Sequence, residues 1–410
     1  MSLTRYLPTP SDRMGILWNL LSVQESIVLE YGPAGTTHFS MSLYGKLGLE
    51  YENRLFTTHM NEDDVVMGDV SRLEAALLEL DKAYHPKVIF VVASSIAAVI
   101  GTDIQGVCNY MSDRVEARLI SFDQGGFRGD YSVGCQSVWK LLAEKFPKRE
   151  IEKRKNTYNL LGVSAGAYRI RSDVWELENL MEEAFHMQLG TCFCLNTSVS
   201  ELETAGGAAI NLVLRDEALS CAKVLEERFG TPSYLGAPYG YQATLEWLQG
   251  IGNIIGKQPE DKIVRRLREK AGKAALYRMS GIMLKRDRPK ATFVGEYYTV
   301  TGLAKFLKQM GIEANYEVCL HSLKTIKRPA ETVHYLETEG ERINMLREVH
   351  HQIVFGDDIS IGMCPTDNVF VRIGMPMIRG VQVANHLPIV GEKGADTILE
   401  RVEEYFQLMQ

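Results

Sequence analysis

The chain lacks the sequence features of three large classes of protein. Its seven cysteines are an odd number scattered over 410 residues, which indicates reduced thiols rather than a disulfide framework. No apolar run reaches the roughly 18 to 20 residues that a membrane span needs, and no basic run or arginine stripe marks a nucleic-acid surface. The N-terminus has no secretory signal pattern. We therefore expect a cytoplasmic globular protein with no membrane or nucleic-acid partner.

Cysteine is missing altogether before Cys108, so the first quarter of the chain has no thiol. Thiolates are the usual ligands of iron–sulfur clusters. The later pair, Cys192 and Cys194, shares one face of a predicted strand, but a complete site needs four ligands. The other cysteines show no ligand spacing, so we interpret the thiols as buried structural residues.

Apolar runs bounded by turn residues alternate with helical patterns along the chain, which is typical of βαβ units around parallel sheets. The charged segment 145–155 breaks this alternation and marks a boundary. We predict an α/β fold of three similar units. The first unit includes a helix over 71–84, a strand over 88–92 and one long helix over 97–112. The predicted units are residues 1–150, residues 151–285 with connector helices, and residues 286–410 with a C-terminal helix.

Three segments in the first quarter carry a resemblance to a known family. They read Gly-Pro-Ala-Gly-Thr-Thr over residues 32–37, Asn-Glu-Asp-Asp-Val-Val-Met-Gly over 61–68 and Ser-Ser-Ile-Ala-Ala-Val-Ile-Gly-Thr-Asp-Ile over 94–104. In order and spacing they resemble component 1 of nitrogenase and its relatives, the dark-operative protochlorophyllide and chlorophyllide reductases and the cofactor-assembly scaffolds. Those proteins read Gly-Pro-x-Gly-Cys, Glu-x-Asp-x-Val-x-Gly-Gly and Glu-Cys-Pro-x-x-x-Ile-Gly-Asp-Asp-Ile. The resemblance implies three Rossmann-like parallel-sheet domains around a central cleft.

The resemblance also implies three cluster-ligand positions at which this chain has no thiol. In the family each subunit offers three cysteines, and the cluster lies at the interface of two subunits. The matching positions fall near residues 10–12, on Thr36 and on Ser95. Oxygens of Asp12, Thr36 or Ser95 could complete the coordination of an iron held mainly by a partner's cysteines. The alternative is that Thr36 and Ser95 cap helices.

Other side chains beside these loops are further candidates. Thr37 and His38 follow the first glycine loop, and His59 precedes the second segment. A histidine there can move protons or ligate metal, or it can serve only as a hydrogen-bonding residue. We include Thr37 and His38 among the candidate cofactor-binding residues.

The resemblance places the ligands of nitrogenase's second metal cofactor, one cysteine and one histidine, at Arg215 and Val381 of this chain. Neither residue is such a ligand, so we do not expect that cofactor to bind through them. Arg215 follows a predicted strand, and its guanidinium can hold a carboxylate or phosphate. The alternative is a surface ion pair with Asp216 or Glu217.

Two motifs point to other chemistry. Residues 162–166 read Gly-Val-Ser-Ala-Gly after a predicted strand, and Asp358 and His386 follow in the chain order of an α/β-hydrolase. The next helix does not start directly behind Ser164, which argues against a serine nucleophile. Residues 252–257 lack the spacing and the hydroxyl residue of a P-loop, so ATP-driven electron transfer would need a separate ATPase.

The resemblance implies a subunit of a nitrogenase-like oxidoreductase complex that does not itself fix nitrogen. Such a subunit would form a homo-oligomer or pair with a cysteine-bearing paralogous component 1 subunit, and it would receive electrons from a P-loop iron–sulfur ATPase. An iron–sulfur cluster at the interface would then come mainly from the partner, with none bound by this chain alone. The alternatives are a non-redox scaffold for binding or assembling a metallocofactor or tetrapyrrole, and a serine hydrolase acting through Ser164.

Overall fold

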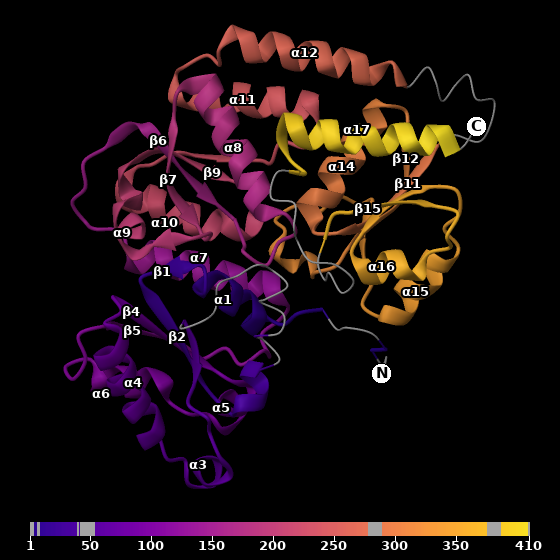
Figure 1. Cartoon of the computed structure of the whole chain (residues 1–410). Coiled ribbons are helices and arrows are strands. Elements are labelled where there is room, and N and C mark those ends of the chain that lie inside the picture. The colour runs from indigo at the N-terminus through magenta and orange to yellow at the C-terminus, as the bar shows by residue number, and fades with distance from the viewer. Residues whose placement is uncertain are drawn as a thin grey trace.

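Three parallel sheets organise the chain in the computed structural model, which describes residues 4–5, 9–38, 41, 54–277, 289–374 and 387–408 (Figure 1). The first sheet has the order β3-β2-β4-β5, with strands β2 (Ser26–Tyr31), β3 (Leu55–Thr57), β4 (Val88–Ala93) and β5 (Arg118–Phe122). The second has the order β10-β9-β6-β7, with β6 (Arg154–Leu161), β7 (Gln188–Phe193), β9 (Ala208–Val213) and β10 (Ser233–Leu235). The third has the order β13-β12-β11-β14-β15, with β11 (Lys290–Gly295), β12 (Glu313–Cys319), β13 (Val333–Tyr335), β14 (Ile353–Gly356) and β15 (Val369–Arg372).

In each of these three sheets there is one point at which successive strands stop being added on one side and continue on the other. The reversals lie between β2 and β4, between β6 and β9, and between β11 and β14. In open α/β sheets, ligands bind outside the carboxyl ends of the strands at such a reversal. The chain thus carries three candidate crevices, and the loops that follow these six strands are where functional residues are expected.

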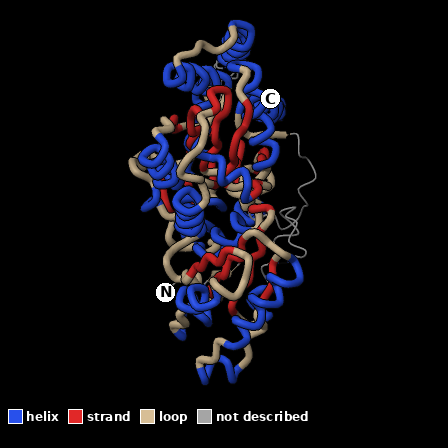
Figure 2. The backbone as a smooth tube through the Cα atoms, turned by 90° about the vertical axis from the view of Figure 1, so that its left-hand side faces the viewer, coloured by secondary structure: helices blue, strands red, loops and turns tan. Residues whose placement is uncertain are grey.

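The strands are buried on both faces because helices cover each sheet on two sides. In β4, Ile89 and Val91 pack toward helices α4 (Ser71–Tyr84) and α6 (Ile104–Met111), whereas Phe90 and Val92 pack toward α1 (Asp12–Leu20) and α7 (Tyr131–Lys145). Figure 2 shows the strands in separate groups along the length of the molecule, with helices around them. This explains why these strands read as continuous apolar runs in the sequence.

Helices α1 (Asp12–Leu20) and α7 (Tyr131–Lys145) lie between the first and second sheets, and one apolar cluster joins them to both. The two helices touch backbone to backbone. A Cβ added at Gly15 would lie 2.1 Å from the Tyr131 carbonyl oxygen, and one added at Gly134 would lie 1.9 Å from the Asp12 carbonyl oxygen. Only glycine permits this approach, which fixes α1 on α7.

A second large apolar cluster joins the second and third sheets. Helices α8 (Ile170–Phe185), α11 (Tyr241–Ile255), α12 (Asp261–Ala275), α14 (Tyr297–Gln309) and the C-terminal α17 (Gly391–Leu408) contribute to it. In Figure 1, α17 runs beside α11 and over α14. Arg266 of α12 bonds to Glu183 of α8 and Glu392 of α17, so the last helix is tied to the second domain as well as to the third.

The remaining elements complete the layers. In the first domain they are α3 (Glu62–Met67), α4 (Ser71–Tyr84), α5 (Ser95–Ile100) and α6 (Ile104–Met111). Strands β1 (Val23–Gln24) and β8 (Thr197–Ser198) pair in parallel and link the first two domains. The others are α9 (Val199–Thr204), η1 (Ala205–Gly207), η2 (Asp216–Ala218), α10 (Leu219–Phe229), η3 (Leu323–Thr325), α15 (Glu339–Arg347) and α16 (Asp358–Met363).

The predicted α/β fold with three parallel-sheet units is confirmed. The single helix expected over 97–112 is wrong, because Gly101 ends α5 in a left-handed conformation and the Asp103 side chain caps a new helix, α6, at the Gly106 N–H. The boundaries at residues 150 and 285 stay predictions, since α1, α7 and α17 each pack on two units. None of the described helices has the length and hydropathy of a membrane span.

Candidate functional site

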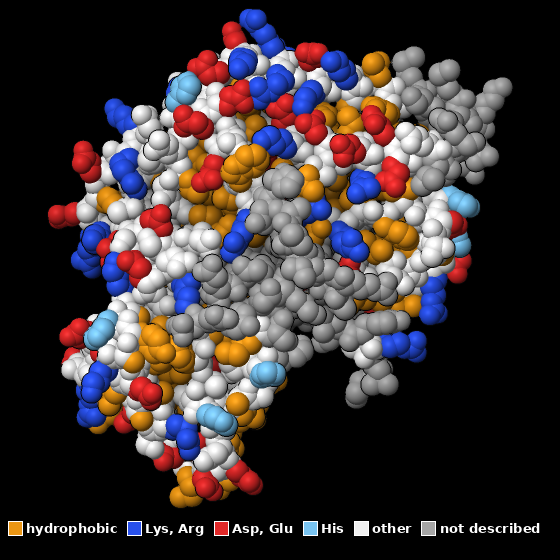
Figure 3. Space-filling model, viewed as in Figure 1, with side chains coloured by type: hydrophobic (Ala, Val, Ile, Leu, Met, Phe, Trp, Pro, Cys, Tyr) orange, Lys and Arg blue, Asp and Glu red, His pale blue; other side chains and the backbone are white. Residues whose placement is uncertain are grey.

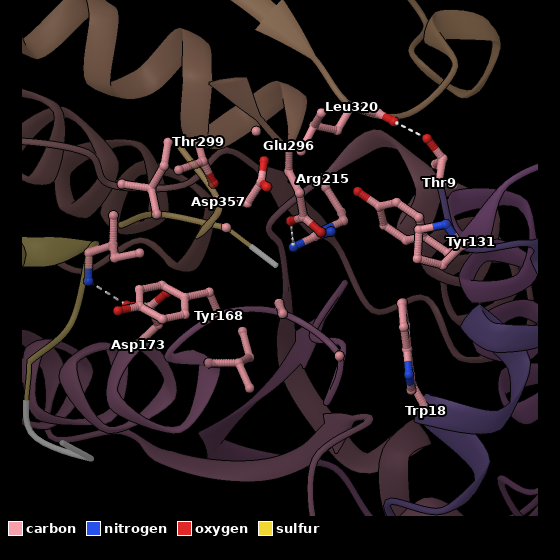
Figure 4. Close-up of a pocket in the computed structure, with 18 of the residues that line it drawn as sticks. Thr9, Trp18, Tyr131, Tyr168, Asp173, Arg215, Glu296, Thr299, Leu320 and Asp357 are labelled. Atoms are coloured by element: carbon pink, nitrogen blue, oxygen red, sulfur yellow. Dashed lines mark hydrogen bonds and ion pairs between the residues drawn. The ribbon is translucent and has the colours of Figure 1, made fainter. Parts of the chain in front are cut away.

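One pocket lies where the reversal points of the second and third sheets meet. Arg215 follows β9, Glu296 follows β11 and Asp357 follows β14, so all three line it from carboxyl ends of strands. Trp18 of α1 and Tyr131 of α7 close the side toward the first domain (Figure 4). The cavity itself is about 80 Å³, within about 850 Å³ of space between the lining atoms that includes open solvent. Its walls thus come from all three domains.

Arg215 and Glu296 form an ion pair across the boundary between the second and third domains. Their Nη2 and Oε2 atoms lie 2.9 Å apart, and the side chains are 16% and 22% exposed. Burial opposes ionisation of Glu296, but Arg215, His321 and hydrogen bonds from Arg215 and Tyr131 together hold its pKa below the usual value. Figure 4 shows the pair next to Tyr131. The alternative of a surface ion pair between Arg215 and Asp216 or Glu217 is therefore wrong, because the arginine turns inward to Glu296 of the third domain.

Asp173 is a buried carboxyl group on the opposite wall of the pocket. Its Oδ1 accepts from the Ile389 N–H at 2.6 Å and from the Val390 N–H at 3.4 Å. Burial raises the pKa of Asp173 to about 7, against the lowering effect of these hydrogen bonds and of Arg169. Asp173 therefore changes charge near neutral pH and joins α8 to the segment that precedes α17.

Asp357 and Arg342 line the pocket from the third domain, and the sequence analysis singled out neither of them. Asp357 caps α16: its Oδ1 accepts from the N–H groups of Ile359 and Ser360, and its Oδ2 from the Ser360 hydroxyl. Burial raises the pKa of Asp357 despite these bonds. The capping pattern of Asp followed by Ser three residues later was a readable signal for Asp357, whereas Arg342 sits in an ordinary charged helix.

The first-domain loops surround a buried ion pair. Arg13 of α1 pairs with Glu30 of β2, and the two side chains are 9% and 0% exposed. Thr36 lies inside the helical segment 34–38, where its hydroxyl donates to Glu30 Oε1 at 2.8 Å or to the Pro33 carbonyl at 2.9 Å. Thr36 is therefore not a helix cap. Arg13 and Glu30 therefore neutralise each other within the chain.

Ser95 is the first residue of α5, two residues after the end of β4. Its hydroxyl donates to the Gly125 carbonyl at 2.6 Å, whereas the cap of α5 is the preceding Ser94, whose hydroxyl accepts from the Ala97 N–H. A Cβ at Gly126 would lie 3.2 Å from Ser11 Oγ and 3.6 Å from Ser95 Oγ. The helix cap is thus Ser94 and not Ser95, as the alternative for Ser95 had it. Ser11 and Ser95, at or beside two of the family's cluster-ligand positions, both lie next to Gly126.

Asp12 is fully buried at the start of α1, beside the N–H groups of Arg13 and Arg128. Burial raises its pKa, opposed by the nearby N–H groups of Arg13 and Arg128. Thr37 is buried in the helical segment 34–38, whereas His38 and His59 are exposed. The structure buries Asp12 at the start of α1 and leaves the two histidines on the surface.

The cysteines of this chain do not fit an iron–sulfur cluster held by this chain alone. Cys108, Cys135 and Cys192 are buried in the apolar packing, and burial raises the pKa of the Cys108 and Cys135 thiols to about 12. A thiol with so high a pKa is a poor thiolate ligand at neutral pH. Across the described ranges, no group of three or more His, Cys, Asp or Glu side chains is placed to hold a metal ion. The interpretation of Cys192 and Cys194 as buried structural thiols agrees with their burial.

The hydrolase motif and the P-loop-like segment have structural roles. Ser164 is 3% exposed. Its hydroxyl oxygen accepts hydrogen bonds from the Gly166 N–H and, at 3.8 Å, from the Cys135 thiol. Asp358 pairs with Arg372 in the third domain, and His386, like Val381, lies outside the described residues. Residues 252–257 end α11 rather than begin a helix, so their N–H groups do not form the phosphate cradle of a P-loop.

This chain is similar in sequence to a known protein family and to several of its characterised members. The family model described as nitrogenase component 1 type oxidoreductase matches residues 11–407. The nitrogenase iron-molybdenum cofactor biosynthesis protein NifE of Clostridium pasteurianum is 28% identical over 333 residues, which are 78% of this chain and 69% of that protein. NifE of Klebsiella pneumoniae is 26% identical over 63% of this chain and 59% of its own length, and NifE of Methanococcus maripaludis strain S2/LL is 22% identical over 61% and 52%.

Solved structures agree at the level of the fold. The structure titled nitrogenase Cp1 at pH 6.5 superposes with a TM-score of 0.80 and 17% identity over 99% of this chain and 94% of that one. The one at pH 5 gives a TM-score of 0.72 and 16% identity over 100% and 90%. The three parallel sheets, the pocket at their reversal points and the family match over nearly the whole chain lead to one conclusion. The chain belongs to the nitrogenase component 1 type oxidoreductase family.

Proposed function

We propose that this chain is a scaffold subunit of a nitrogenase-like complex, that it binds an anionic cofactor or cofactor precursor in the interdomain pocket, and that it does not itself fix nitrogen. It pairs with a cysteine-bearing paralogous subunit, which supplies the thiolates of any cluster at the interface. A separate P-loop iron–sulfur ATPase supplies electrons where the complex is reduced.

The contrast between the two crevices carries this proposal. The first-domain loops, where the family has cluster ligands, hold the buried Arg13–Glu30 pair and the hydrogen-bonded Thr36 and Ser95. The interdomain pocket is lined by two arginines, aromatic rings and buried carboxyl groups. A chain that kept the pocket and replaced its thiols is suited to holding a ligand rather than to passing electrons to it.

The names of the relatives support a role in cofactor assembly. NifE of Clostridium pasteurianum, of which this chain covers 69%, is described as an iron-molybdenum cofactor biosynthesis protein. The positions matching the cofactor's cysteine and histidine ligands are Arg215 and Val381 here, so we propose that the ligand is held by charge and shape and not by those two metal bonds. A tetrapyrrole carboxylate fits the same description.

An exposed apolar surface on the first domain supports a protein partner. Val66 and Met67 of α3 and Val99 of α5 are 75%, 78% and 72% exposed, and Figure 3 shows hydrophobic side chains at the tip of the lower lobe. Contiguous exposed apolar side chains mark interaction sites more often than free surface. This surface belongs to the helices that flank the degenerate cluster loops.

The test is anaerobic purification of the chain alone and co-expressed with a cysteine-bearing paralogue, with iron and acid-labile sulfide measured per complex. We expect background iron and sulfide in the chain alone and a stoichiometric amount in the co-purified complex. A paralogue in which the cluster cysteines are replaced by serine serves as the control and should co-purify without iron. Failure of the two chains to co-purify, or a complex without iron, would contradict the proposal.

A further inference from the structure

The cavity of the interdomain pocket is smaller than a cofactor-sized ligand needs. Its volume is about 80 Å³, whereas sites for organic ligands usually enclose about 300–1,000 Å³. Arg215 and Glu296 both line this cavity, and Figure 4 shows the pair beside Tyr131. Both side chains keep some exposed surface, so solvent reaches them. A ligand that enters the pocket must therefore move side chains that now occupy it, and this ion pair is among them.

The Arg215 side chain is held in place along its length. Gly162 has a φ of 87°, and a Cβ added there would lie 2.9 Å from Arg215 Cγ, so the arginine stem packs directly on the backbone of this glycine. The carboxylates of Glu296 and Glu217 both stabilise the positive charge, and Glu296 contacts the guanidinium at 2.9 Å. Arg215 is thus a fixed cation at the pocket wall, with a carboxylate of the same chain already bound to it.

Glu296, in contrast, has partners for its carboxylate besides Arg215. The Tyr131 hydroxyl donates a hydrogen bond to it, and the His321 imidazole adds a favourable electrostatic interaction. Glu296 also holds the N-cap position of α14, where its side chain makes no capping hydrogen bond. The carboxylate can therefore leave Arg215 while it keeps other partners, and its departure removes no cap from the helix.

We propose that Glu296 is an internal ligand of Arg215, and that a carboxylate or phosphate group of an incoming ligand displaces it from the guanidinium. This proposal rests on the proposed use of the pocket as a site for an anion. A guanidinium binds either anion through two parallel N–H donors. While the pocket is empty, Glu296 spares the protein a buried arginine without a counter-ion. The internal pair also lowers the apparent affinity for the anion, because only molecules in which Arg215 is free can bind it.

Isothermal titration calorimetry at low ionic strength tests this proposal with three probes: benzoate, phenyl phosphate and neutral benzamide. Glu296→Gln removes the competing charge and keeps a side chain of similar size. We expect it to bind benzoate or phenyl phosphate at least about tenfold more tightly than wild type, since Arg215 is then free in most molecules. The double variant with Arg215→Gln should lose this gain.

The matched control is Glu246→Gln. It removes the partner of Lys305 from another ion pair, which joins α11 to α14, and it leaves the pocket untouched. Its affinity for both anions should equal that of wild type. Glu296→Asp is a second variant for the case that Glu296→Gln shows no cooperative unfolding transition. It keeps the charge on a shorter side chain, so we expect a smaller gain in anion affinity than in Glu296→Gln.

The outcomes are distinct. A gain confined to benzoate supports the proposal with a carboxylate ligand, and a gain confined to phenyl phosphate supports it with a phosphate ligand. Equal affinity of wild type and the Glu296 variants, the same gain in Glu246→Gln, binding of benzamide as tight as that of the anions, or no anion binding to any of these proteins would overturn it. None of these results bears on whether the chain co-purifies with a cluster-bearing paralogue, which tests the proposed function separately.

Discussion

Arg13 and Glu30 are the residues that most change the interpretation of the first-domain loops. The sequence identified the positions near residue 12, at Thr36 and at Ser95, and the structure places them around the carboxyl ends of β2 and β4. The sequence could not identify Glu30 as the partner of Arg13 and Thr36, because a glutamate in an apolar strand gives no sign of its partner. The pairing of Arg215 with Glu296 was hidden for the same reason, since 81 positions of chain separate them.

The Arg13–Glu30 pair predicts a coupled effect on stability. Arg13→Met leaves a buried carboxylate without its cation, which typically costs about 3–5 kcal/mol. The double variant with Glu30→Met should recover most of that loss, because a well-packed apolar pair often replaces a buried ion pair without penalty. Hydrogen exchange of the β2 and β4 amides measures both variants locally. The single variant Glu30→Met completes the set. If the loss in the double variant equals the sum of the losses in the two single variants, the coupling is contradicted.

Asp173 predicts a pH dependence with a definite sign. Burial raises its pKa to about 7, so the folded chain binds this proton more tightly than the unfolded chain, whose aspartate titrates near pH 3.9. The stabilising contribution is complete below about pH 4 and is lost as pH rises through about 7. The melting temperature of wild type should therefore fall relative to that of Asp173→Asn between pH 5 and 8. Parallel curves for the two proteins would show that Asp173 does not titrate there.

At the scale of elements, hydrophobic patterns were reliable where one helix or strand packs on one neighbour. The expected helix over 71–84 is α4, and the expected strand over 88–92 is β4. The pattern missed α1, whose residues are buried all round between two sheets and so show no polar face. The pattern also joined α5 to α6. Gly101 ends α5 through its left-handed backbone conformation and Asp103 begins α6 through its side-chain cap, and the hydrophobic pattern shows neither.

The contact of α1 with α7 predicts that its two glycines are essential to packing. Gly134→Ala places a Cβ 1.9 Å from the Asp12 carbonyl oxygen, and neither backbone can yield without moving a helix. We expect a loss of about 3 kcal/mol or more, at the upper end of the usual cost of overpacking. Gly272→Ala in α12 is the control, because a Cβ there meets no atom within 4 Å, and alanine should stabilise that helix by up to about 1 kcal/mol. Similar urea midpoints for the two variants would contradict the backbone contact.

At the scale of the whole molecule, the three sheets act as one frame because elements pack across them. The α1–α7 layer joins the first and second sheets, and Tyr298 and the Lys327 N–H both bond to Asp216 across the second and third domains. The overall architecture could be predicted from the alternation of strands and helices together with the family resemblance. The pocket could not, since its walls come from segments that only the packing of three domains brings together.

The central claim is that this chain keeps the family's frame but cannot hold an iron–sulfur cluster by itself. The most direct measurement is anaerobic reconstitution of the purified chain with ferrous iron and sulfide, followed by desalting and determination of bound iron, sulfide and the electron paramagnetic resonance spectrum. The account predicts no stoichiometric iron and no cluster signal after desalting. A cluster that is retained in stoichiometric amount by the chain alone, and lost in Asp12→Ala, would contradict it.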